Sequence, residues 1–154
     1  MVQLDSIDRQ ILLELQQDSK QTYAEIGEKV GLAAATVHAR AKSLEKRGVI
    51  GRYGAYVDAR AVGLPVLAFV SIVVDNGSSC TDLGPLLEPF PEIEACHSVA
   101  GDVDLLLQVR VATPEALEHL LYRIKQVKGV ARTRSSVVLT TRFEERPKVP
   151  PALE

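Results

Sequence analysis

The sequence predicts an α+β protein of two small units, a helical unit and then a mixed unit with the element order βαββαβ. Apolar residues recur at helical spacing as far as Gly48, and strand-forming runs alternate with helical patterns from Pro65 onward. The chain has 154 residues, of which 46% are hydrophobic and 25% charged. It is therefore long enough for two small globular domains and lacks the composition of a disordered protein.

The first two helices are predicted from their capping residues. Asp5 is suited to be the N-cap of a first helix that ends at residues 18–20, because the positive N-terminal end of a helix stabilises a carboxylate. Thr22 and Glu25 form a capping box at the start of a second helix. Gly31 is expected to end that helix in the left-handed conformation, where a residue without Cβ has no steric penalty.

A third helix is predicted over residues 34–47 and completes a helix-turn-helix. Gly27 is small where two crossing helices must touch, Gly31 lies in the turn, and Val37 locks one helix onto the other. These residue types predict a winged-type helix-turn-helix over residues 1–50 that enters the DNA major groove. An αα-hairpin with a solvated basic face is the alternative.

Positive charge is concentrated around the third helix. Between His38 and Arg52 there are five basic residues and one acidic residue, whereas residues 65–154 carry nine basic and twelve acidic residues. The net charge of −2 alone argues against a nucleic-acid partner. A basic stripe on one small unit is nevertheless typical of a DNA-binding unit joined to a body with another task.

The mixed unit is predicted over residues 65–143, after a linker strand over 51–64 and before a loose tail over 144–154. Pro85 leaves the start of its first helix insecure, because proline is tolerated only in the first turn. The predicted elements are a strand over 66–74, a helix around Leu83 and Leu87, strands over 93–99 and 103–111, a helix from Thr113 to Gly129 and a strand over 130–140. This order predicts a ferredoxin-like antiparallel sheet with both helices on one face.

The first strand of that sheet is apolar on both sides. Alternate residues from Val66 to Val74 point one way, while Leu67, Phe69 and Val73 point the other way. A sheet face exposed to water would carry polar residues at alternate positions. The face without helices must therefore be buried, and a second copy of the chain is the simplest cover. A homodimer would also present two recognition helices to two half-sites on DNA.

Three stretches together resemble the Lrp/AsnC family of transcriptional regulators, the feast/famine proteins. They read LDSIDRQILLELQQD, VGLAAATVHARAKSLEKRGVIGRYGAYVD and, over residues 94–104, EACHSVAGDVD. The resemblance implies an N-terminal helix-turn-helix, a C-terminal βαββαβ (RAM-type) ligand-binding domain, dimers that often assemble into octamers, and amino acids as effectors. Ala33 replaces the usual serine of the recognition helix, and Val103 replaces the usual aromatic residue of the effector turn.

The DNA contacts are predicted from residue type and position. Phosphate contacts give affinity without sequence information, and the N-terminal part of the recognition helix reads base edges. Three consecutive alanines from Ala33 predict modest base specificity with help from DNA bendability. Arg40 is assigned to DNA ahead of the alternative, in which it braces the helix through a salt bridge. The predicted DNA-binding residues are Thr36, His38, Arg40, Lys42, Lys46, Arg47 and Arg52.

A small-molecule site is predicted at the turn formed by residues 101–104. Gly101 lets a ligand approach the backbone, and Asp102 or Asp104 can pair with an α-ammonium group. The alternative is a tight turn with solvated acids. The resemblance adds Ser98 and residues 136–138 as the lining of a pocket between subunits. The predicted effector-binding residues are Ser98, Gly101, Asp102, Asp104, Ser136 and Val137.

Other functions are less well supported by the residues. Cys80 and Cys96 do not form a disulfide framework or a metal-ligand spacing, so we expect no metal and no cofactor, with Cys96 as a buried thiol beside an ordinary His97. An architectural DNA-binding or ligand-binding protein is the alternative function. A siroheme-decarboxylase-like enzyme is less favoured, because no nucleophile–base or paired-acid constellation is evident. No apolar run could span a membrane, and we expect a cytoplasmic protein.

Overall fold

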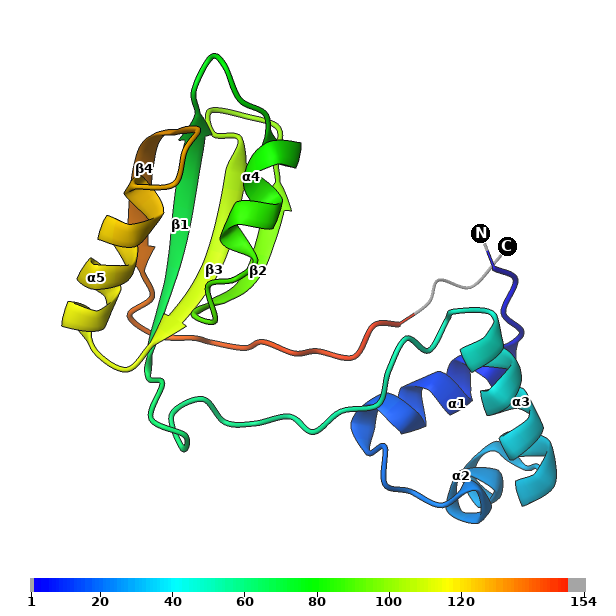
Figure 1. Ribbon diagram of the computed structural model, residues 1–154. Helices are drawn as coiled ribbons and strands as arrows, with labels where there is room; N and C mark the ends of the chain where they lie inside the picture. The colour runs from blue at the N-terminus through cyan, green and yellow to red at the C-terminus, as the bar shows by residue number, and fades with distance from the viewer. Residues whose placement is uncertain (1, 150–154) are drawn as a thin grey trace. The chain divides into compact units, whose positions relative to one another are not determined.

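The computed structural model describes residues 2–149 and divides the chain into two compact units (Figure 1). Within the described residues, the helical unit combines residues 2–56 with residues 143–149, and the sheet unit comprises residues 57–142. The elements are α1 (Ser6–Gln17), α2 (Tyr23–Val30), α3 (Ala34–Lys46), β1 (Val66–Val74), α4 (Cys80–Leu87), β2 (Ile93–Ser98), β3 (Leu105–Val111), α5 (Pro114–Lys125) and β4 (Val130–Val137). Among the described residues, no helix is both long and apolar enough to cross a membrane.

The helical unit begins and ends its first two helices where the sequence predicts. The Asp5 side chain caps α1, Thr22 and Glu25 form the capping box of α2, and Gly31 ends α2 with φ 72°. The three helices enclose one apolar core. Its fully buried side chains are Ile11, Ile26, Val37, Ala41 and Leu44.

Gly27 is the point of closest approach between α2 and the turn that leads into α3. A Cβ atom at this position would lie 2.4 Å from the carbonyl oxygen of Leu32. The Leu32 amide in turn donates to the Gly27 carbonyl, at 2.9 Å. Only glycine therefore allows α2 and the turn to pack at this distance, as the spacing predicts.

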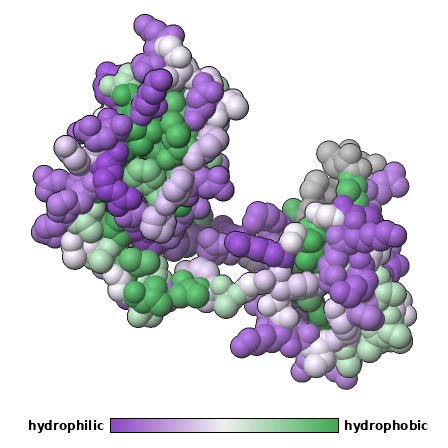
Figure 2. Space-filling view, viewed as in Figure 1, coloured by the Kyte–Doolittle hydropathy of each residue, from purple (hydrophilic) through white to green (hydrophobic). Residues whose placement is uncertain are grey.

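The sheet unit is a four-stranded antiparallel sheet in the order β2-β3-β1-β4. Helices α4 and α5 both cover the same face of this sheet (Figure 1). Figure 2, which is viewed from the helix side, shows apolar atoms between the two helices and polar atoms on their outer surfaces. The side chains buried beneath the helices include Ala68, Val70 and Ile72 of β1 and Leu105, Leu107 and Val109 of β3.

The opposite face of the sheet carries no helix. Leu67, Phe69 and Val73 of β1 lie on it, because side chains alternate across a strand and the residues between them belong to the core beneath the helices. Leu106 of β3 pairs with Ser71 and lies on the same face. Phe69 remains 38% exposed. The apolar character of β1 on both sides is thus confirmed, and we call this surface the open face.

The structure differs from the sequence prediction at several boundaries. In the described chain no strand lies between Lys46 and Val66, where a linker strand was expected over residues 51–64. The strands β2, β3 and β4 are shorter than the predicted 93–99, 103–111 and 130–140.

The sequence prediction left the start of α4 insecure, and the structure places it at Cys80. Ser79 and Asp82 form a capping box at its N-terminus, a signal that the sequence contains and that was overlooked. Pro85 consequently lies at the sixth residue of the helix rather than in its first turn. Its missing N–H leaves the Thr81 carbonyl without an intrahelical donor, and the helix tolerates this because Thr81 is exposed to solvent.

The C-terminal residues form more than a loose tail. The segment from Phe143 onward belongs to the helical unit, where the Gln16 side chain bonds both backbone groups of Lys148. This contact places residues 143–149 against α1. Residues 150–154 of the predicted tail lie outside the described residues.

Replacing Gly27 with alanine tests the packing of α2. We expect Gly27→Ala to lower the free energy of unfolding of the helical unit by about 1–3 kcal/mol, because the clash with a backbone carbonyl exceeds the gain in helix propensity. Urea unfolding followed by far-UV circular dichroism measures the change. Gly84→Ala is the matched control, because a Cβ at that helical glycine meets nothing within 4 Å. A Gly27→Ala protein as stable as the wild type would contradict this account.

Candidate nucleic-acid interface and effector site

The N-terminal part of α3 presents small side chains to solvent. Ala33 is the N-cap and makes no side-chain capping bond, so the missing cap predicted from the sequence is confirmed. Ala34, Ala35 and Thr36 are exposed on the first turn. Methyl groups at this end can contact thymine methyls in a major groove but supply few hydrogen bonds to bases.

Arg40 braces α3 against α1. Its Nη1 donates to Asp5 Oδ2 at 2.6 Å and to Asp8 Oδ1 at 2.8 Å. Asp8 is only 6% exposed, and Arg47 also approaches it, with 3.7 Å between Nη1 and Oδ2. The Arg40 guanidinium therefore makes the bracing salt bridge, which was the alternative interpretation of the sequence, and its contact with DNA stays a prediction.

The pKa values of this group reflect the same contacts. The Asp8 backbone N–H, followed by the Arg40 guanidinium, lowers the pKa of the Asp5 carboxyl. Hydrogen bonds to Asp5 and then Asp8 raise the pKa of Arg40. Both groups are therefore charged at neutral pH, and the ion pair joins the N-terminus of α1 to the middle of α3.

A second polar chain connects α3 to the segment that follows it. Lys42 Nζ lies 2.8 Å from Glu45 Oε2, and the Tyr53 hydroxyl donates to Glu45 Oε1 at 3.1 Å. Burial, followed by the hydrogen bond to Glu45, raises the pKa of Tyr53 to about 12. Tyr53 therefore keeps its proton at neutral pH and holds the connector on the recognition helix.

The remaining predicted DNA-binding side chains are exposed. His38 packs its ring against Tyr23, with 5.0 Å between ring centroids. Lys46 and Arg52 form no ion pair within the described part of the chain. The structure thus brings six of the seven residues onto or beside α3 and places Arg52 on the connector. It leaves Lys46 and Arg52 as the cations most available to phosphate.

The turn at residues 101–104 uses its two acids differently. Asp104 Oδ2 accepts the Val74 backbone N–H at 2.8 Å, and the Asp104 backbone N–H donates to Ile72 at 2.9 Å. Asp102 is exposed, and Gly101 has φ 147°, which favours glycine. The Asp104 carboxylate thus fastens the turn to the end of β1, a role that the sequence did not predict, and its contact with an α-ammonium group stays a prediction. Asp102 is left as the acid available to an α-ammonium group.

Ser98 lies beside this turn and lines a cavity of about 380 Å³ between α4 and β2. Cys80 and Cys96 line the same cavity, and the Cys80 thiol donates to the Asp104 carbonyl at 3.5 Å. Cys96 is exposed at the sheet edge, so the expectation of a fully buried thiol was wrong, although partial burial raises the pKa of Cys96. Within residues 2–149, no group of three or more His, Cys, Asp or Glu side chains could hold a metal ion.

Ser136 and Val137 lie on the opposite edge of the sheet from Ser98. They belong to β4 and pair with Phe69 and Ala68 of β1, whereas Ser98 belongs to β2. Two strands separate these edges. One protomer therefore does not bring the two halves of the predicted effector site together.

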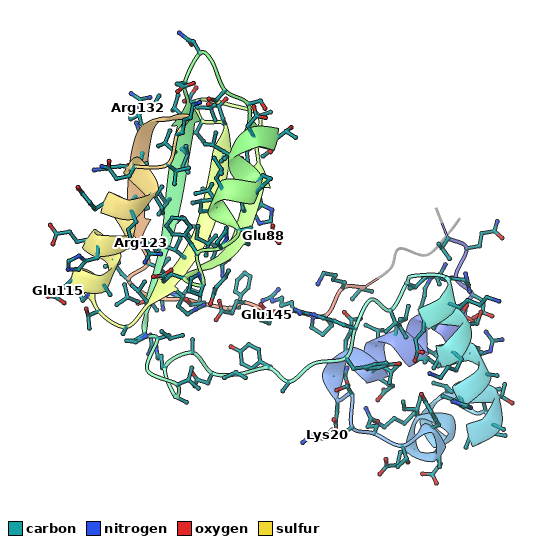
Figure 3. The ribbon with its side chains drawn as sticks, viewed as in Figure 1. Lys20, Glu88, Glu115, Arg123, Arg132 and Glu145 are labelled. Atoms are coloured by element: carbon teal, nitrogen blue, oxygen red, sulfur yellow. The ribbon has the colours of Figure 1, made fainter. Side chains whose placement is uncertain are left out.

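The open face also carries a polar cluster that sequence reasoning missed. Glu94 accepts hydrogen bonds from Arg110 Nε at 2.7 Å and from Gln108 Nε2 at 2.8 Å. Arg132 and Arg134 of β4 pair with Val73 and Ser71 and so share this face; Figure 3 labels Arg132 at the start of β4. Polar residues at alternate positions of β3 were the available signal.

Family models match both units of the chain. The model described as the AsnC-type helix-turn-helix domain matches residues 4–45. The model described as the Lrp/AsnC ligand binding domain matches residues 67–148. The second match alone covers more than half of the chain.

Curated relatives and solved structures agree with these matches. The HTH-type transcriptional regulator LrpA of Mycobacterium tuberculosis is 41% identical over 96% of this chain and 97% of its own length. A feast or famine regulatory protein from M. tuberculosis complexed with L-methionine is 40% identical, covers 96% of this chain and 100% of that chain, and has a TM-score of 0.90. A transcriptional regulator in an L-Met complex from Neisseria meningitidis is 28% identical, covers 97% of each chain and has a TM-score of 0.89.

The Arg40 brace predicts a difference between two basic residues of α3. Arg40→Ala should lower the free energy of unfolding of the helical unit by about 1–3 kcal/mol, because it leaves the buried Asp8 carboxylate without its nearest cation. Partial exposure of Arg40 keeps this loss below that of a fully buried pair. Lys46→Ala should change the free energy of unfolding of the helical unit by less than about 0.5 kcal/mol. Equal losses in urea unfolding would contradict the assignment.

Proposed function

The chain belongs to the Lrp/AsnC family of transcriptional regulators, and we propose that it binds DNA as a dimer whose assembly or affinity responds to an amino acid. The observation that carries this proposal is the exposed, basic α3 in a helix-turn-helix unit joined to a sheet unit with an uncovered apolar face. The relatives are named transcriptional regulators, so we assign the chain a regulatory role rather than an enzymatic one.

The DNA interface that we propose is centred on α3. Lys42, Lys46 and Arg52 contact phosphates, while Thr36 and His38 on the exposed side of the helix meet base edges. Arg40 and Arg47 hold α3 in place through their contacts with Asp8. Their remaining N–H groups are offered to the DNA backbone. Ala33, Ala34 and Ala35 leave much of the base preference to DNA shape.

The open face is the proposed dimer interface. Four strands spaced about 4.8 Å apart, each about seven residues long, give a sheet surface of roughly 450 Å² before side chains are added. That is the scale of one side of a standard protein interface, which buries about 800 Å² of accessible surface per partner. Apolar Leu67, Phe69 and Leu106 lie centrally, and the Glu94–Arg110 pair supplies a polar border.

The proposed effector site needs residues from more than one protomer. Gly101 and Asp102 from one chain offer backbone amides and a carboxylate, and Ser136 and Val137 from another chain complete the lining. L-methionine is present in two solved relatives, so an amino acid is the proposed ligand class. An effector in such a site can change assembly only by binding one assembled state more tightly than another. Because the DNA partner is cytoplasmic in bacteria and archaea, we place the protein in that compartment.

DNA binding over a salt series tests the function. The purified protein should bind a fragment that carries its own promoter, with an affinity that falls steeply as salt rises. Lys46→Ala should weaken binding and reduce the slope of log K against log salt by about one per subunit, because one phosphate contact is lost. Glu118→Ala, at an exposed position on α5, is the matched control. Binding that ignores salt and Lys46 would overturn the proposal, and equal affinity for unrelated DNA would favour an architectural protein.

The effector is tested by repeating the titration with L-methionine and the other amino acids. If an amino acid changes the DNA affinity of the wild type, Asp102→Asn should abolish that change. The DNA affinity of this variant without the amino acid should equal that of the wild type. An unchanged response in this variant would remove Asp102 from the proposed site.

Replacing Phe69 tests the dimer interface. Phe69→Glu places a charge at the centre of the open face, so light scattering should show a shift from dimer, or larger assembly, toward monomer. Tyr122→Glu is the matched control, because Tyr122 is a 66% exposed aromatic residue on α5. Circular dichroism checks that both variants fold. A wild-type protein that is monomeric at micromolar concentration would contradict the interface.

A further inference from the structure

The C-terminal segment, residues 143–149, returns to the helical unit after the sheet unit is complete. Gln16 in the last turn of α1 accepts the Lys148 backbone N–H through Oε1 at 2.7 Å. Its Nε2 donates to the Lys148 carbonyl at 3.0 Å and to the Leu12 carbonyl at 3.1 Å. One side-chain amide thus takes both backbone groups of a residue 132 positions away, as a neighbouring strand would.

The connector that leads out of the helical unit reaches the same end of α1. A cavity of about 390 Å³ is lined by Leu12, Leu15 and Gln16 of α1, by residues 49–53 of the connector, and by Lys148 of the C-terminal segment. The two segments that link the units therefore meet α1 at one place. The helical unit is tied to the sheet unit twice.

The C-terminal segment carries charged side chains near the end of α1. The last turn of α1 has no basic residue, and Asp18 follows it, so this helix end is negative. Arg146 and Lys148 line a second cavity, of about 610 Å³, together with Asp18 and Lys20; Figure 3 labels Lys20 and, on the C-terminal segment, Glu145. Arg146 also stacks over Phe143, with 3.8 Å from Cζ to the ring centroid. The segment thus places Arg146 and Lys148, together with Glu145, beside Asp18 and Lys20.

The C-terminal segment follows β4 after a short stretch of chain. The Val138 backbone N–H still donates to the Leu67 carbonyl at 2.9 Å, so the chain is held to β1 until that point. Five residues later, at Phe143, it belongs to the helical unit. Five residues span at most about 18 Å. The linker between β4 and the C-terminal segment is therefore short.

We propose that the C-terminal segment is a strap, gripped by Gln16, that restrains the helical unit and couples its position to β4. The evidence for this grip is the pair of hydrogen bonds between Gln16 and Lys148. Its regulatory consequence, that an effector bound near Ser136 acts on the DNA-binding unit through α1, rests on the proposed function. In this proposal Gln16 positions the helical unit and contacts neither the DNA nor the amino acid effector.

The mobility of the helical unit tests the grip without DNA or effector. A dye is attached to Glu28→Cys on α2 in a full-length Cys80→Ser, Cys96→Ser background, and its fluorescence anisotropy decay is recorded. Gln16→Ala should increase the amplitude of nanosecond motion about twofold. In the same variant without the dye, backbone amides of residues 143–149 should exchange hydrogen about tenfold faster. Gln10→Ala, an exposed glutamine on the same helix, should match the wild type in both measurements.

Truncation after Arg142 is the second variant, because it removes the strap and leaves α1 unchanged. It should reproduce the increased motion seen in Gln16→Ala. If neither variant differs from Gln10→Ala in anisotropy decay, the strap does not restrain the helical unit and the proposal is overturned.

The coupling is measured as the ratio of DNA dissociation constants with and without L-methionine. In Gln16→Ala this ratio should move toward one, while the affinity without methionine stays within about twofold of the wild type. An unchanged ratio, together with a mobile helical unit, would overturn the regulatory role. If the wild type does not respond to methionine, the effector part of the proposed function fails, whereas a restrained helical unit and slow exchange of residues 143–149 still support the grip.

Discussion

The apolar character of β1 on both of its faces is the constraint on which the rest of the structure depends. β1 lies inside the sheet, between β3 and β4, and its apolar side chains alternate without a polar interval except at Ser71. Helices α4 and α5 cover one face only. A second chain on the other face would bury Phe69 and Leu106 at about 25 cal/mol per Å² of apolar surface removed from water. The same contact would place two recognition helices in one particle, which a two-half-site DNA target requires.

Electrostatics in the helical unit separate residues that position α3 from residues that can meet DNA. The Asp8 carboxylate is nearly buried and is approached by Arg40 of α3 and by Arg47, which caps the end of α3. Any phosphate contact by Arg40 must therefore compete with an acid that has no other cation at a comparable distance. Removing one member of such a pair costs more than an exposed contact contributes. Lys46 and Arg52 face no such competition within the described chain. Affinity for DNA is thus separated from the placement of α3.

The sequence predicted those parts of the fold that depend on near neighbours. The capping residues Asp5 and Thr22, the left-handed Gly31 and the Thr113–Pro114 helix start act within four residues, so their chemistry can be read directly. Contacts between distant residues could not be read in this way. Arg40 is exposed by helical spacing and still binds acids more than thirty residues away, and Asp104 looks like a free acid until Val74 is placed beside it. A capping box at Ser79 was readable but was obscured by Pro85.

The residues of the proposed effector site are divided between opposite sheet edges, and this division would link assembly to effector binding. Ser98, Gly101 and Asp102 lie at the β2 edge, while Ser136 and Val137 lie at the β4 edge, so a single protomer presents two incomplete surfaces. A ligand that needs both surfaces binds only where chains meet, and its binding free energy therefore favours the assembly that forms the site. A tenfold preference for one assembly corresponds to about 1.4 kcal/mol, which one charge-assisted bond between Asp102 and an ammonium group can supply. Asp104 Oδ2 already accepts the Val74 backbone N–H, whereas Asp102 is exposed, so we expect Asp102 to be the main acid of the proposed site.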